Sequence, residues 1–111
     1  MRVWYTRLLF WADGFTLCQG LILLHPRVRN DAALLEHEKA HVAQMRRDGT
    51  LCFWWRYLTS AKARLDYEAQ AYSVQLRYAP GSLQTFAAYL SNNYALGISQ
   101  DQARAAIESK T

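Results

Sequence analysis

The chain has 111 residues, of which 51% are hydrophobic and 20% are charged. A chain of this length and composition has enough apolar side chains for one hydrophobic core, which predicts a single globular domain over residues 1–111 and excludes an intrinsically disordered protein. The formal net charge is +4. Because the basic residues are spread along the sequence without forming a basic run, we do not expect nucleic acid as a partner.

The cysteine content further limits the class of protein. Cys18 and Cys52 are the only cysteines, too few for the disulfide framework of a small secreted domain. We therefore expect free thiols and a cytoplasmic protein, in which histidine and carboxylate side chains would hold any metal. Asp13 interrupts the apolar N-terminal stretch, which argues against a signal peptide. No apolar run approaches the ~20 residues of a transmembrane helix, so no membrane span is expected.

Two segments rich in β-forming residues come first. Residues 3–12 and 15–24 flank the pair Asp13-Gly14, which suits the positive φ angles of a tight turn. This pattern predicts an antiparallel hairpin. Pro26 is expected to end its second strand, because proline cannot donate a ladder hydrogen bond.

The rest of the sequence is helical in composition. The best-defined helix covers residues 32–48, with Asn30 or Asp31 as its N-cap. Its apolar positions do not form one stripe, so we expect it to be buried on more than one side. Ser99 and Gln102 form a capping-box pattern at the last helix. The further helices are expected over residues 51–58, 61–79, 82–94 and 100–109. This order predicts an α+β fold, with an N-terminal antiparallel hairpin or small sheet followed by about four helices.

The first helix contains the pattern His-Glu-x-x-His. His37 and His41 are four residues apart and therefore lie on one helix face, where two imidazoles can bind a single zinc ion. Glu38, next to the first histidine, can reach a water molecule at the metal as a general base. The alternative is a polar helix face whose histidines bind nothing.

A catalytic zinc ion needs a third protein ligand and an open position. His25 is the only other histidine and lies upstream, so the third ligand is expected to be a carboxylate on a later helix. Glu68 and Asp66 compete for this role, and they project about 200° apart around a helix, so only one can face the metal. Glu68 is our candidate because alanines flank it and permit close helix packing. The alternative for Glu68 is an ordinary surface ion pair with Arg64, four residues earlier.

This motif, followed by a glutamate on a later helix, resembles the gluzincin branch of the zincin metallopeptidases. In that branch, two histidines of the motif helix and a glutamate of a later helix bind zinc. The sequence around the motif is also similar to small bacterial and phage zincin-like domains, and the resemblance covers roughly residues 15–75. The similar segments are residues 20–24, 33–44 and 67–72.

The resemblance implies a zinc-dependent hydrolase that cleaves peptide bonds in a peptide or protein substrate. His37, His41 and Glu68 would bind Zn²⁺, and Glu38 would take a proton from the bound water and pass it to the leaving amine. The strand over residues 15–24 would offer its edge to an extended substrate.

The resemblance also implies two supporting roles. A tyrosine or histidine usually stabilises the oxyanion, and Tyr72 is the first candidate because it lies one turn after Glu68 on the same helix face. The candidates behind it are Tyr67, Tyr57 and His25. Gln44, three residues after His41, is a candidate hydrogen-bond partner for a metal ligand.

Longer gluzincins close the cleft with a second lobe after the motif, and 111 residues leave no room for one. A protein partner would then complete the cleft. The alternative function is a zincin-fold binding or assembly module, with structural or vestigial zinc, that docks a protein partner through the aromatic block Phe53 to Tyr57. For the block itself we favour core packing over contact with nucleic acid or a membrane, because a small domain needs large apolar side chains.

Overall fold

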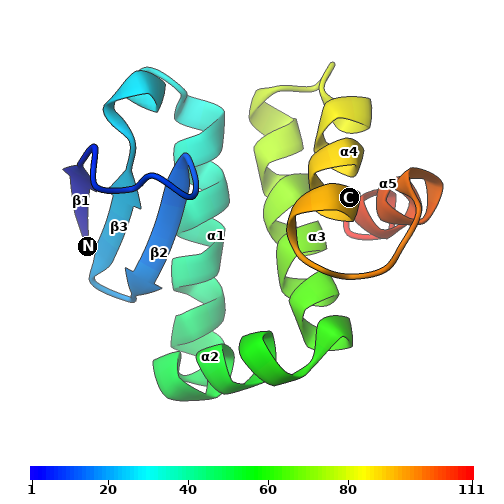
Figure 1. The fold of residues 1–111 in the computed structure, drawn as a ribbon, viewed down its shortest axis with the longest axis horizontal. Coiled ribbons are helices and arrows are strands. Elements are labelled where there is room, and N and C mark those ends of the chain that lie inside the picture. The colour runs from blue at the N-terminus through cyan, green and yellow to red at the C-terminus, as the bar shows by residue number, and fades with distance from the viewer.

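A computed structural model describes residues 1–111 and shows an α+β fold, which confirms the predicted class (Figure 1). A small mixed sheet at the N-terminus is followed by helices. The strands are β1 (Arg2–Tyr5), β2 (Gly14–Cys18) and β3 (Leu21–Leu24). A short 3₁₀ helix, Pro26–Val28, precedes α1 (Ala32–Asp48), α2 (Thr50–Thr59), α3 (Ala61–Tyr78), α4 (Leu83–Asn93) and α5 (Gln100–Glu108).

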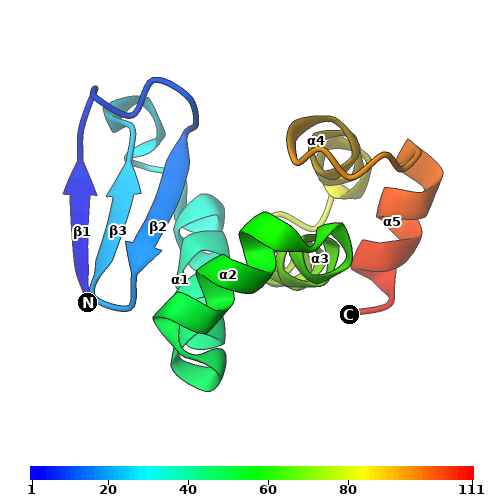
Figure 2. The same cartoon turned by 60° about the horizontal axis from the view of Figure 1, so that its bottom comes forward.

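The sheet has the strand order β1-β3-β2, with β3 in the centre (Figure 2). β2 and β3 form an antiparallel hairpin with its turn at Gln19-Gly20, whereas β1 pairs with β3 in parallel. The predicted hairpin between residues 3–12 and 15–24 is therefore wrong. The second of these segments folds back on itself at Gln19-Gly20, and this local pairing leaves one edge of β3 for β1.

The segment that connects β1 to β2 crosses the end of the sheet (Figure 1). The backbone N–H of His25 donates to the carbonyl of Asp13 at 2.8 Å, and the side chain of Leu9 is buried. These two anchors hold the connection in place. Phe10 and Trp11, which follow the buried leucine, remain exposed.

α1 covers the predicted residues and is buried on two sides. The Asp31 carboxylate accepts a hydrogen bond from the backbone N–H of Leu34 at 2.9 Å, which confirms the N-cap. The helix ends at Gly49, whose φ of 87° is the left-handed conformation that glycine adopts readily. One side of α1 packs on the sheet through Val42, and another packs against α3.

α2 links α1 to α3, and α3 runs back alongside α1 (Figures 1 and 2). Phe53 of α2 packs with Met45 of α1 and Tyr67 of α3 in a small buried cluster. The largest core cluster lies among α3, α4 and α5. The capping box of Ser99 and Gln102 at the start of α5 is present as predicted.

Candidate metal centre

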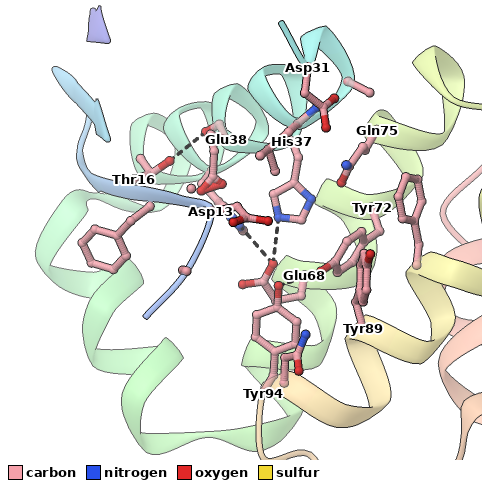
Figure 3. A pocket seen from close by; sticks show the side chains of 18 of the residues that line it. Asp13, Thr16, Asp31, His37, Glu38, Glu68, Tyr72, Gln75, Tyr89 and Tyr94 are labelled. Carbon is pink, nitrogen blue, oxygen red and sulfur yellow. Dashed lines mark hydrogen bonds and ion pairs between the residues drawn. The ribbon is translucent and has the colours of Figure 1, made fainter. Parts of the chain in front are cut away.

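Three buried side chains meet between α1 and α3. His37 and His41 lie one turn apart on α1, and Glu68 faces them from α3; Figure 3 shows the His37 ring and the Glu68 carboxylate pointing at one another. Glu68 Oε1 lies 3.1 Å from the Nε2 atom of each histidine. The exposed fractions of the three residues are 4%, 6% and 3%. The structure thus brings together the three residues that the sequence suggested as ligands.

The spacing of these three atoms suits a shared metal ion. Ligand atoms about 2.0–2.1 Å from a tetrahedral zinc ion are separated from one another by roughly 3.3 Å. Both nitrogen-to-oxygen distances in the site are 3.1 Å, so only small shifts would be needed. Two imidazole nitrogens and one carboxylate oxygen also match the donor set of catalytic zinc sites, which keep a fourth position open.

Gln44 determines which nitrogen of His41 carries the hydrogen. The Gln44 amide nitrogen donates to the carbonyl of Tyr67 and to Gln70 Oε1, each at 2.9 Å, so its oxygen faces His41 Nδ1 at 2.8 Å. That oxygen can only accept, which places the hydrogen of His41 on Nδ1. The lone pair of Nε2 then points at the Glu68 carboxylate. Two acceptors repel each other unless a cation, either a proton or a metal ion, lies between them.

The charges in the site favour a bound cation. Burial alone would lower the pKa of His41, but the Glu68 carboxylate raises it to about 9. Burial alone would raise the pKa of Glu68, but His41 and His37 hold it well below its usual range. Glu68 is therefore anionic at neutral pH and attracts positive charge. The other ring nitrogen of His37, Nδ1, is buried without a hydrogen-bond partner in the protein.

Glu38 lies beside these three residues, next to β2. One of its carboxylate oxygens and one ring nitrogen of each histidine all lie within 4.8 Å of one another. Burial raises the pKa of Glu38, and the nearby histidines oppose this effect. Thr16 Oγ1 donates to the Glu38 carbonyl at 3.0 Å, and a Cβ atom on Gly14 would lie only 3.2 Å from Glu38 Cγ. The glycine therefore permits the close approach of β2 to this glutamate.

The other carboxylate considered as a ligand lies outside the site. Asp66 is exposed and forms an ion pair with Lys110. Arg64 does not pair with Glu68, because its guanidinium donates to the carbonyls of Tyr57 at 2.6 Å and Tyr94 at 2.8 Å. Glu68 is thus directed to the histidines rather than to the surface.

Tyr57 holds the second oxygen of Glu68. Its hydroxyl donates to Glu68 Oε2 at 2.5 Å. Burial, followed by the charge of Glu68, raises the pKa of Tyr57, so this tyrosine remains a donor at neutral pH. With Oε2 held in this way, Oε1 is the oxygen that faces both histidines.

Tyr72 lies next to the histidines and is paired with a tyrosine that the sequence did not point to. Its ring packs edge-on against His37 with the ring centres 4.5 Å apart, and its hydroxyl lies 2.8 Å from the hydroxyl of Tyr94. Figure 3 shows Tyr94 near Glu68 as well. Tyr94 follows α4 and reaches the site only through tertiary packing, so no local sequence signal could have identified it.

The two remaining oxyanion candidates make other contacts. The Tyr67 hydroxyl donates to Asp48 Oδ2 at 2.7 Å. His25 caps the 3₁₀ helix, where its Nδ1 atom accepts from the backbone N–H of Arg27 at 3.1 Å. Neither side chain is directed at the buried histidines.

The histidines and both glutamates line a cleft of about 1050 Å³. One wall comes from β2 and the connection before it. The opposite wall comes from α4, through residues that include Thr85, Tyr89 and Asn93. α4 folds back across α3 to provide this wall (Figure 2). Gln75 also lines the cleft, and its buried Oε1 atom has no partner in the protein.

The edge available to an extended ligand is shorter than predicted. β3 is central in the sheet, so of the expected strand over residues 15–24 only β2 lies at an edge. Trp54 covers part of this edge, because its Nε1 atom donates to the carbonyl of Leu17 at 2.9 Å. The free part is the start of β2, from Gly14 to Thr16, directly beside Glu38.

The aromatic block is divided between core and surface. Phe53 is buried, and Trp54 and Tyr57 pack against it with ring centres 5.3 and 5.6 Å away. Trp55 is 70% exposed. Core packing therefore accounts for the inner side of α2 but not for the outer side.

Comparison of the chain with models of protein families, with curated proteins and with solved structures finds no match. None of the helices combines the length and apolar character required to cross a membrane. The findings establish a small α+β domain with a buried His-Glu-His cluster and a nearby glutamate that could bind a metal ion.

Proposed function

We propose that this protein is a zinc metallopeptidase, with His37, His41 and Glu68 as the metal ligands. One observation carries the proposal: Gln44 fixes the hydrogen of His41 on Nδ1 while the opposite nitrogen faces the Glu68 carboxylate at 3.1 Å. This arrangement requires a proton or a metal ion between the two atoms, and two histidines with one carboxylate are a donor set typical of catalytic zinc. The resemblance of the motif to gluzincins supports the same ion and the same chemistry.

Glu38 is the proposed general base. A bound zinc ion would polarise the carbonyl of a peptide and make water more acidic. Glu38 would accept a proton from the attacking water and deliver it to the leaving amine. Burial raises the pKa of Glu38, which makes this carboxylate a stronger base than an exposed glutamate.

Tyr72 is the proposed oxyanion donor, and its pairing with Tyr94 supports this role. The two hydroxyl groups lie 2.8 Å apart, and when Tyr94 donates to Tyr72, the hydrogen of Tyr72 remains free to be donated to a substrate oxygen. Burial raises the pKa of both tyrosines, which keeps both protonated at neutral pH. A neutral donor of this kind stabilises negative charge as it develops on the peptide carbonyl.

Metal analysis tests the ligand set. We expect the wild-type protein, purified without added metal, to contain about one zinc ion per chain. Glu68→Ala should lose most of the zinc, whereas the matched control Asp66→Ala should keep it, because Asp66 is exposed and paired with Lys110. Wild-type protein without zinc, or zinc retained in Glu68→Ala, would contradict the proposed ligands.

Hydrolysis of a mixture of unstructured peptides tests the reaction. Glu38→Gln preserves the size of the side chain but removes the base. We expect this variant to retain zinc and to hydrolyse peptides about 10²–10⁴-fold more slowly than the wild type. Equal rates for the two proteins would exclude Glu38 as the base and with it the proposed reaction.

A second candidate function follows from the outer side of α2. Leu51, Trp55 and Leu58 are 87%, 70% and 71% exposed, and their spacing places them along one side of the helix. This apolar stripe supports the alternative of a module that docks a protein partner, with zinc structural or vestigial. Under this alternative, Glu38→Gln behaves as the wild type in every assay, whereas Trp55→Ser weakens association with the partner.

A further inference from the structure

Four aromatic rings line the cleft on the side of β2. Phe10 and Trp11 belong to the connection before the strand, Phe15 lies on the strand, and Trp54 comes from α2. Successive ring centres in this order are 5.2, 5.9 and 5.5 Å apart. The hydrogen bond from Trp54 to the carbonyl of Leu17 fixes the inner end of the row at the edge of β2. We call Trp11, Phe15 and Trp54 the aromatic shelf.

Alternation along β2 places the aromatic shelf beside a bound peptide. Thr16 points toward α1, since its hydroxyl donates to the Glu38 carbonyl at 3.0 Å. Because successive side chains of a strand point to opposite sides, Phe15 projects away from α1 and lies between Trp11 and Trp54. In a peptide paired with the free edge of β2, the residue opposite Phe15 would point the same way, and its neighbours would point toward Glu38.

The opposite wall of the cleft combines rings with polar groups. Beside Phe86 and Tyr89 it includes Thr85, Asn92 and Asn93 from α4 and the unpartnered amide oxygen of Gln75 from α3. A large apolar side chain on that wall would cover these polar atoms without giving them hydrogen bonds, which is unfavourable. On the shelf the same side chain meets the rings of Trp11, Phe15 and Trp54, while Asp13 and Arg27, which also line this side of the cleft, are paired with each other. The shelf therefore suits a large apolar group better than the opposite wall does.

We propose that the aromatic shelf is a specificity subsite that receives a large apolar or aromatic side chain of an extended peptide paired with β2. The inference rests on the proposed peptidase function and names its substrate class: unstructured peptides with a large apolar residue close to the cleaved bond. The exposure of the shelf supports it. Trp11 is 58% exposed, and a bound side chain would remove its ring from water.

Peptide binding to the zinc-loaded Glu38→Gln variant tests the shelf without requiring turnover. The probes are unstructured peptides of one sequence in which a single position is Phe, Leu, Ala or Glu. We expect the Phe and Leu peptides to bind roughly tenfold or more tightly than the Ala peptide, and the Glu peptide to bind most weakly. Adding Trp11→Ala should remove most of this preference. Because Trp11 is 58% exposed, this substitution should leave the protein folded.

Trp55→Ala is the matched control, because Trp55 is also an exposed tryptophan, at 70%, but does not line the cleft. It should leave the preference unchanged. The shelf proposal would be overturned if the wild type cleaved the peptides without preference for Phe or Leu, or if the Trp11→Ala variant kept the preference. Either result would leave the peptidase function standing. Selective binding without cleavage by the wild type would keep the shelf and overturn the peptidase function.

Discussion

Replacement of Gln44 by methionine tests whether the hydrogen position of His41 controls metal binding. Methionine fills a similar volume but neither accepts from His41 Nδ1 nor donates to the Tyr67 carbonyl. A neutral His41 is then free to carry its hydrogen on Nε2 and to donate it to the Glu68 carboxylate, whose Oε1 atom lies 3.1 Å away. That hydrogen occupies the position at which a metal would bind, and when zinc displaces it the hydrogen left on Nδ1 has no acceptor.

The size of the effect follows from the contacts of Gln44. Loss of a side chain that orients a metal ligand lowers metal affinity by about 10–100-fold, which corresponds to about 1.4–2.7 kcal/mol. Three hydrogen bonds of 2.8–2.9 Å are lost as well. At about 0.5–1.5 kcal/mol for each bond, the free energy of unfolding of the metal-free protein should fall by about 1.5–4.5 kcal/mol.

Zinc affinity measured by competition with a chromophoric chelator is the appropriate assay, with circular dichroism as the check on folding. Gln44→Glu is the matched control: it keeps an acceptor for His41 Nδ1 but loses the two amide donors. It should therefore lose stability as the methionine variant does, yet bind zinc about as tightly as the wild type. A folded methionine variant with wild-type zinc affinity would refute the argument from the hydrogen position.

Two further predictions concern the glycine beside the site and the acid stability of the fold. Gly14→Ala places a Cβ atom 3.2 Å from Glu38 Cγ. The free energy of unfolding should therefore fall by about 1–3 kcal/mol in denaturant titrations, and peptide hydrolysis should slow while zinc is retained. Gly20→Ala, whose Cβ would meet nothing within 4 Å, should change neither the unfolding free energy nor the rate of hydrolysis. For Asp48, the hydrogen bond from Arg47 is the largest cause of a pKa held below its usual range, so its stabilising effect is present above the ordinary pKa of about 4 and is lost as pH falls. Asp48→Asn should therefore cost about 1–2 kcal/mol at pH 7, and its difference from the wild type should narrow below about pH 4 in urea titrations; a constant difference would contradict this assignment.

The elements that depend on local signals were predictable from the sequence. Asp31 and Gly49 mark the ends of α1, and the capping box at Ser99 marks the start of α5. The spacing of His37 and His41 on one helix face also requires only helical periodicity. In each case the deciding interaction joins residues a few positions apart, so the sequence pattern contains the physical cause.

The features that the sequence did not reveal depend on contacts between distant residues. β1 pairs with β3 in parallel because the chain turns at Gln19-Gly20, which pairs β2 with β3 and leaves one edge of β3 for β1. The Asp13-Gly14 pair is an equally plausible turn in the sequence, and no short-range rule decides between the two. Tyr94 and α4 reach the cleft only because the cluster shared by α3, α4 and α5 folds the chain back across α3. These placements are decided by packing rather than by local pattern.

The energetics of the buried histidine and glutamate cluster favour a role in cation binding over a role in stabilising the fold. His37, Glu38, His41 and Glu68 are all buried in a domain of 111 residues, although such domains are stable by only about 5–15 kcal/mol. Replacing buried ionic groups by apolar ones is often neutral or stabilising by about 1–4 kcal/mol, so packing alone does not favour these residues. A cation that binds only the folded chain offsets the cost, by about 4 kcal/mol at a free concentration 1,000 times the dissociation constant. The folded state of this protein and the occupancy of the proposed metal centre should therefore be thermodynamically linked.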